Sequence, residues 1–149
     1  LTREDTLECP DSWESEKVDF IVADALALPF ACGTFSGLSS LNILDKVPSP
    51  LKHLTEMNRV AAASKAQLLF SDPFSWSEEV APQRDWLGGK ENGDYSGKGL
   101  DNVSCLLGGE NGLIGPPWDI GPRGEVWWKI RTHTNHFELI RSLYLRARR

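Results

Sequence analysis

The sequence is poor in cysteine, and none of its cysteines forms a close pair. Its 149 residues contain Cys9, Cys32 and Cys105, which lie far apart and form no C-x-x-C motif. This spacing excludes a recognisable disulfide framework and a recognisable zinc site. We therefore predict no metal site, and we expect three buried or half-buried thiols.

Long apolar runs and basic stripes are also missing. No stretch approaches the roughly 20 apolar residues that cross a bilayer, and no basic start leads into an apolar signal core. We therefore expect a cytoplasmic protein that makes no membrane contact. The net charge is −5, and the only basic cluster is the tail Arg146–Arg149, which argues against a nucleic-acid surface.

Three short apolar runs are present, and each ends on polar residues. The first is Val18–Ala25 with Asp24 near its end, the second is Phe35–Leu44 followed by Asp45, and the third is Ala66–Asp72. Their length and apolar content are typical of buried strands. In open α/β sheets the ligand crevice lies outside the carboxyl ends of the strands, so these polar ends are candidate ligand contacts.

Helical patterns separate the later strands. Ser49 is a suitable N-cap, Pro50 suits the first helical position, and apolar residues then recur at three-to-four-residue spacing. A second, shorter helix is predicted over Leu100–Leu107. Strands joined by helix-length segments favour an α/β fold with a parallel sheet.

Two further segments complete the chain. Residues 75–98 are rich in glycine and polar side chains, which is typical of a surface loop, with a substrate lid as the alternative. Alternating residues over 125–131 and 137–147, joined by a short polar connection, predict an antiparallel hairpin that closes the sheet. We expect a polar arm over residues 1–17 and one α/β domain over 18–149.

The segments "VADALALPF", "FSGLSSLNILDKVPSPLKHLTEMNRV" and "AQLLFSDPFSW" resemble, in this order, the class I S-adenosylmethionine-dependent methyltransferases of the small-molecule type 11 group. The resemblance covers roughly Val18–Arg149. It implies a truncated Rossmann-like sheet in which parallel strands are followed by an antiparallel hairpin. It also implies methyl transfer from S-adenosylmethionine to a small-molecule acceptor.

The resemblance assigns roles to particular residues. Asp24, Ala25 and Leu26 match the adenine end of the cofactor site, where the Asp24 carboxylate accepts a hydrogen bond from the adenine amino group. Asn42, Ile43 and Leu44 match the strand end that faces the methionine part. Asp45 stands where many relatives carry a histidine, so it is a candidate general base, with an ordinary loop acid as the alternative.

The family's Gly-rich turn and ribose-binding acid have no counterpart in these residues. In the family's sheet, the two strands that carry them lie between the strand ending at Asp24 and the strand ending near Asn42. We therefore expect weak or absent cofactor affinity. We also expect the exposed edges to pair directly with each other or to recruit a second copy into a homo-oligomer.

Several alternatives stay open. Trp127 and Trp128 either line an aromatic acceptor pocket or serve in packing. His133 and His136 resemble metal ligands but lack a third ligand, so polar loop residues are the simpler interpretation. The chain could also be a non-catalytic interaction domain of methyltransferase descent, or a fragment of a nicotinamide-dependent oxidoreductase.

Overall fold

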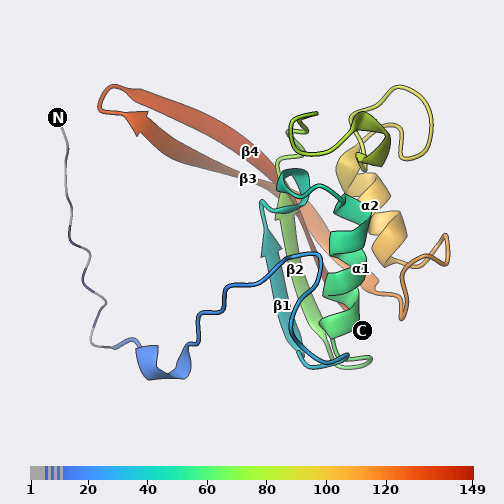
Figure 1. The fold of residues 1–149 in the computed structure, drawn as a ribbon, viewed down its shortest axis with the longest axis horizontal. Helices are drawn as coiled ribbons and strands as arrows, with labels where there is room; N and C mark the ends of the chain where they lie inside the picture. Colours follow the sequence, from blue (N-terminus) through green and yellow to red (C-terminus); the bar gives the residue numbers. More distant parts are fainter. Residues whose placement is uncertain (1–5, 7, 9, 11) are drawn as a thin grey trace.

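The computed structural model describes residues 6, 8, 10 and 12–149 (Figure 1). Four strands form one sheet: β1 (Gly37–Leu41), β2 (Gln67–Asp72), β3 (Asp119–His133) and β4 (His136–Arg148). The two α-helices are α1 (Pro50–Val60) and α2 (Gly99–Leu107). Three short 3-10 turns are η1 (Ser15–Lys17), η2 (Leu44–Lys46) and η3 (Gln83–Asp85).

The sheet is mixed, as the sequence predicts. Its strand order is β1-β2-β4-β3, in which β1 and β2 are parallel while β4 is antiparallel to both of its neighbours. The strands expected around positions 35–44 and 66–72, the helix at Pro50, the helix over 100–107 and the terminal hairpin are all confirmed. The chain therefore has an α/β fold that is a partial Rossmann-like domain.

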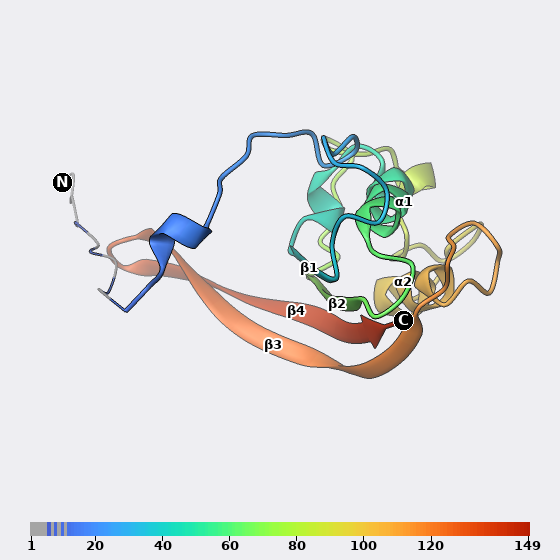
Figure 2. The ribbon, with the colours of Figure 1, turned by 90° about the horizontal axis from the view of Figure 1, so that it is seen from below.

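Both α-helices cover the same face of the sheet (Figure 2). Leu54 and Met57 of α1 and Val103 and Leu106 of α2 belong to one core cluster, together with the alternate strand residues Leu68, Phe70, Leu145 and Ala147. Alternate residues of a strand point to opposite faces, so the intervening residues face away from both helices. In the described part of the chain, no helix covers that second face.

The outer edge of β1 is unpaired. The Ser36 carbonyl accepts a hydrogen bond from the Gln67 N–H, and the Asn42 N–H donates to the Ser71 carbonyl. Even-numbered residues of β1 therefore direct their backbone groups toward β2, while Gly37, Ser39 and Leu41 direct theirs outward. Among the described residues no strand lies on that outer side, so the edge keeps its free donors and acceptors.

The strand predicted over Val18–Ala25 is wrong, and of the two alternatives expected for the exposed edges, direct pairing of this run with β1 is not found among the described residues. Residues 18–23 belong to no helix or strand, and Phe20 and Val22 are 95% and 104% exposed. A strand needs a neighbour to satisfy its backbone N–H and C=O groups, and the two strands expected beside this run have no counterpart among these residues. The run instead leads away from the sheet in both ribbon views (Figures 1 and 2).

The β3–β4 hairpin extends well past the other strands (Figure 1). Its outer part is a two-stranded ribbon on which Trp127, Phe137 and Leu139 are exposed.

The expectation of buried or half-buried thiols is wrong at two positions, because Cys32 and Cys105 are exposed. Cys9 lies outside the described residues. Within the described part of the chain, no helix is long and apolar enough to span a membrane.

Candidate functional site

The carboxyl ends of β1 and β2 lie side by side, and the chain turns sharply after each of these strands. Asn42 follows β1 with φ of 58°, and Phe74 follows β2 with φ of 54°. This left-handed conformation is uncommon outside glycine and is relatively tolerated by asparagine. The two turns send the chain into η2 on one side and into the loop after Pro73 on the other.

Asn42 is the centre of a hydrogen-bond network across the sheet. Its side-chain oxygen accepts hydrogen bonds from the Ser71 hydroxyl at 3.1 Å and from the Ser142 hydroxyl at 2.8 Å. Ser142 in turn accepts a hydrogen bond from the Trp128 indole N–H at 3.0 Å. Trp128 therefore acts as a half-buried packing and hydrogen-bonding residue that fixes the end of β1 to β2 and β4.

Asp45 and Asp72 form a reciprocal brace between the two strand ends. The Asp72 carboxylate accepts hydrogen bonds from the Leu44 and Asp45 N–H groups in η2, at 2.8 and 3.3 Å, and from the Phe74 N–H at 2.8 Å. The Asp45 Oδ2 accepts from the Ser75 N–H and hydroxyl, at 2.8 and 2.7 Å. Each acid therefore holds the loop that follows the other strand.

Both carboxylates are almost completely buried, with exposed fractions of 1% for Asp45 and 0% for Asp72. Burial, and secondly the nearby charge of Asp45, raises the pKa of Asp72 to about 7. The Oδ1 atom of Asp45 has no hydrogen-bond partner among the described residues. Among the described residues, this oxygen is the one carboxylate oxygen of the brace that has no partner, and it is buried.

The predicted adenine-end residues lie in a tight turn. The Asp24 carboxylate accepts a hydrogen bond from the Leu26 N–H at 2.8 Å, and the Asp24 side chain is exposed. His53 Nδ1 donates to the Ala25 carbonyl at 3.1 Å, because that carbonyl can only accept. His53 Nε2 then accepts from the Ser40 hydroxyl at 3.0 Å, so one side chain ties the turn to β1.

The turn is also fastened to α1 further along. The Glu56 carboxylate accepts a hydrogen bond from the Leu28 N–H at 2.7 Å. Arg59 donates to Glu56 and also to the carbonyls of Leu28 and Phe30, at 3.0 and 2.8 Å. The hydrogen bond from Arg59 lowers the pKa of Glu56, so the carboxylate stays charged and the turn stays anchored to the helix.

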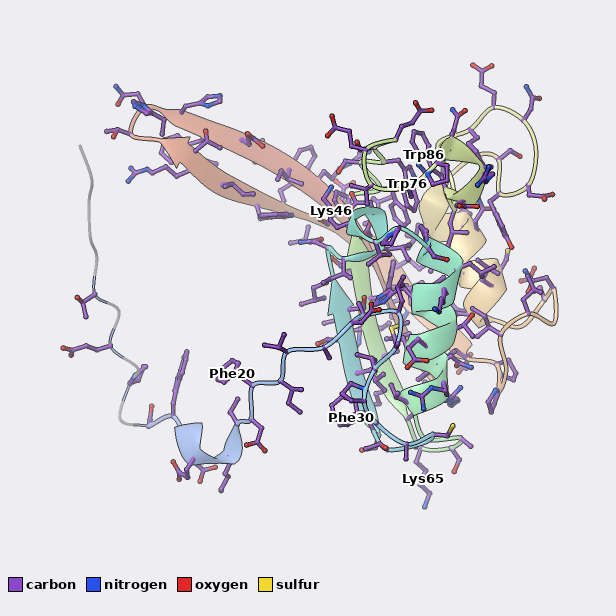
Figure 3. The ribbon with its side chains drawn as sticks, viewed as in Figure 1. Phe20, Phe30, Lys46, Lys65, Trp76 and Trp86 are labelled. Carbon is purple, nitrogen blue, oxygen red and sulfur yellow. The ribbon has the colours of Figure 1, made fainter. Side chains whose placement is uncertain are left out.

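Aromatic side chains gather near the carboxyl ends of β1 and β2. Trp76 and Trp86 are stacked with their ring centroids 6.1 Å apart, and Phe74 lies 6.1 Å from Trp76. Figure 3 shows both tryptophans and Lys46 at this end of the sheet. Asn102 of α2 donates hydrogen bonds to the carbonyls of Leu87, Tyr95 and Ser96, so the loop over 75–98 is anchored to the helix.

Two of the other predicted residues differ in accessibility. Ile43 is 40% exposed beside Asn42, whereas Leu44 is in the core and its N–H is used by Asp72. Trp127 is exposed and donates to Glu125 at 3.1 Å. His133 and His136 are opposite each other in the strand register at the tip of the hairpin. His136 Nδ1 lies 2.7 Å from the Thr132 hydroxyl oxygen.

Sequence reasoning missed the linking residues. For His53 the sequence holds a usable signal, because this histidine is in register with the apolar face of α1. Ser71 and Ser142 carried no signal, because their partner Asn42 is 29 and 100 residues away in the chain. For Asp72 the sequence pattern indicates only the end of a strand.

Comparisons with known proteins give structural neighbours only, because no family model and no curated protein matches the chain. A S-adenosylmethionine-dependent methyltransferase from Methanosarcina mazei is 16% identical with a TM-score of 0.56, over 88% of this chain and 66% of that one. The chain is also similar to a structure whose description is the conversion of a disulfide bond into a thioacetal group during echinomycin biosynthesis. The identity is 18% and the TM-score is 0.54, over 87% of this chain and 55% of that one.

A S-adenosylmethionine-dependent methyltransferase from Aquifex aeolicus is 17% identical, over 88% of this chain and 55% of that one, but its TM-score of 0.45 carries no argument. The likeness to the Methanosarcina mazei structure defines the class of fold, which is that of the class I S-adenosylmethionine-dependent methyltransferases. This chain spans 66% of the first neighbour and 55% of the second. It therefore corresponds to part of that domain.

Proposed function

We propose that this chain forms the acceptor side of an enzyme that transfers a methyl group from S-adenosylmethionine to a small molecule. The fold supports this proposal, since solved methyltransferases share it. The activity is assigned to the complete domain, because this chain covers only part of its neighbours.

The observation that carries the proposal is the convergence of polar groups at the carboxyl ends of β1 and β2. Asn42 holds the turn after β1, and the brace of Asp45 and Asp72 fixes the loops on both sides. In open α/β sheets, ligands bind at this edge. Methyl transfer depends largely on holding two reactants in line, so a rigid edge suits it.

Asp45 is proposed as the group that takes a proton from the acceptor. Its Oδ1 lacks a hydrogen-bond partner among the described residues, but the side chain is enclosed and is held by Ser75. A base must come within hydrogen-bond reach of its proton. The role therefore requires the loop at Ser75 to move when an acceptor binds.

The residues present fit only one end of the cofactor. Asp24 is exposed, its Oδ2 is used by no hydrogen bond among the described residues, and the adjoining turn is fixed by His53. These groups suit an adenine amino group. The described residues include no Gly-rich turn between a strand and a helix and no second acid for ribose hydroxyls, so no catalytic step through the cofactor is derived for this chain.

Amide chemical shifts on titration with S-adenosylhomocysteine test the proposed site. We expect a weak complex with Kd in the millimolar range, or about −4 kcal/mol, whose shifts gather at the Asp24–Leu28 turn. Asp24→Asn should remove the shifts, whereas Asp94→Asn, in the exposed loop, should leave them unchanged. Shifts confined to other parts of the chain, or no shifts at all, would overturn the proposal.

A non-catalytic interaction domain is the second candidate. The exposed apolar residues of the segment before Asp24 and of the hairpin favour it, because such side chains are typical of contact surfaces. The same titration separates the two candidates, since an interaction domain has no reason to retain a nucleoside-binding turn. No structural feature favours an oxidoreductase over methyl transfer.

A further inference from the structure

The uncovered face of the sheet contains a broad hollow. It has a volume of about 1210 Å³ and lies at the end of the sheet where β1 and β2 begin. Its walls come from β1, β2, the C-terminal part of β4 and the start of β3, including Ser39, Leu69, Arg146 and Arg148. It is therefore opposite the candidate site, and none of the site residues lines it.

The hollow combines positive charge with apolar surface. Arg148 is paired with Asp119 at 3.0 Å, and Arg149 is committed to the carbonyls that end α1. Lys65 and Arg146 have no carboxylate partner among the described residues and are exposed. Leu69, directly beside Arg146 in the sheet register, is 40% exposed, so an acidic and apolar chain segment would be complementary to this surface.

The chain carries one segment of that chemistry, residues 12–23, which we call the acidic segment. It has three carboxylates against one lysine, and it includes the apolar run that starts at Val18. Lys17 pairs with Glu14 at 2.7 Å, which leaves Glu16 and Asp19 without a cationic partner among the described residues. Figure 3 shows Phe20 pointing away from the folded body, with Lys65 at the lower edge of the sheet.

The acidic segment does not occupy the hollow of its own chain. The turn that follows it is pinned to α1 by His53 and Glu56, and α1 covers the opposite face of the sheet. The segment would have to pass around the free edge of β1 to reach its own hollow. A neighbouring molecule has no such constraint.

We propose that the hollow binds the acidic segment of a second copy of this chain, so that two chains exchange segments in a symmetric dimer. Val18, Phe20 and Val22 would cover Leu69 and the adjoining strands, while Glu16 and Asp19 would face Lys65 and Arg146. Reciprocal exchange fills two equivalent hollows, as a two-fold interface requires. Residues 18–23, which follow η1, span up to about 20 Å when extended. This proposal does not rest on the methyltransferase assignment.

Sedimentation of the 149-residue chain and two charge-reversed variants tests the exchange. The segment variant is Glu16→Lys with Asp19→Lys, and the hollow variant is Lys65→Glu with Arg146→Glu. We expect the wild type to be dimeric at about 100 µM, and each variant to dimerise at least about tenfold more weakly, because like charges then face each other.

Mixing the two variants is the decisive step. In the mixed dimer both exchanged segments meet a hollow of opposite charge, so we expect the affinity to be restored. Two controls match the changes in net charge at exposed sites outside the contact: Glu78→Lys with Glu79→Lys, and Lys52→Glu with Lys129→Glu. Both should dimerise as the wild type does.

Three results would overturn the proposal. The first is a wild type that stays monomeric at that concentration. The second is a dimer that neither charge reversal weakens, which would put the contact elsewhere, for example at the free edge of β1. The third is a pair of weakened variants that do not recover on mixing.

Discussion

The two faces of the sheet differ in what covers them. On one face, α1 and α2 enclose a core that includes Phe70 and Leu145, both without exposed surface. On the other face, Leu41 and Leu69 are 50% and 40% exposed and no helix of the described residues lies over them. The difference teaches that the burial that stabilises the chain takes place on the helix-covered face of the sheet, while the uncovered face is available for contacts with another molecule.

The largest expected effect contrasts a phenylalanine on the covered face of the sheet with one in the acidic segment, which is proposed to cover the other face of a second copy. Phe70→Ala removes a fully buried ring from the covered face, so we expect the free energy of unfolding to fall by about 3–5 kcal/mol. Phe20→Ala removes a ring that is 95% exposed, and we expect a change within about 0.5 kcal/mol. Urea unfolding at concentrations that keep the chain monomeric measures both. Equal losses would mean that Phe20 is packed.

A second prediction concerns the buried carboxylate on the covered side. The unfolded chain releases the Asp72 proton near pH 4, whereas the folded chain keeps it until about pH 7. Unfolding therefore releases a proton between these values, and the contribution of Asp72 to stability is lost as the pH rises. From pH 5 to pH 8 this contribution should fall by about 3 kcal/mol.

Asp72→Asn should make the stability profile flatter over this range. The variant loses an acceptor for the Phe74 N–H, so it should be less stable than the wild type at pH 5 and as stable or more stable at pH 8. His53 titrates in both proteins and cancels in the comparison; its pKa is lowered by burial, so it acts in the opposite direction. Parallel profiles of stability against pH for the wild type and the variant would show that Asp72 of the folded chain is ionised over the whole range from pH 5 to pH 8.

The smallest effect concerns the loop that packs beside the carboxyl edge. A Cβ atom at Gly99 would collide with the Phe74 ring, which is itself enclosed by Phe70 and Trp76. Gly99→Ala should therefore cost about 1–3 kcal/mol through overpacking. Gly37→Ala, on the uncovered side, meets no atom within 4 Å and should change the stability by less than about 0.5 kcal/mol. A neutral Gly99→Ala would show that the loop is loose.

The sequence predicted the elements whose partners are present in the chain. β2 and α1 have strong local patterns and also bury their apolar residues against each other. The run Val18–Ala25 has an equally strong local pattern, but its neighbours are absent, so the pattern alone did not make a strand. A β-strand forms only when a segment with suitable residues also has a neighbouring strand to pair with.

The candidate site was predicted only in outline. The positions of Asn42 and Asp45 after β1 could be read from the sequence, whereas Asp24 lies in a turn that follows no strand. The brace between Asp45 and Asp72, and the link from Ala25 through His53 to Ser40, join residues 13 to 30 positions apart. Such contacts depend on how the strands and α1 are arranged, which no local pattern specifies.

Calorimetric titration of the chain with S-adenosylmethionine tests most directly whether only one end of a cofactor site is present. The adenine-end turn alone offers too few contacts for a tight complex, so we predict no binding in the micromolar range. Micromolar binding by these 149 residues would contradict the account, because the described residues would then have to supply the ribose and methionine contacts as well.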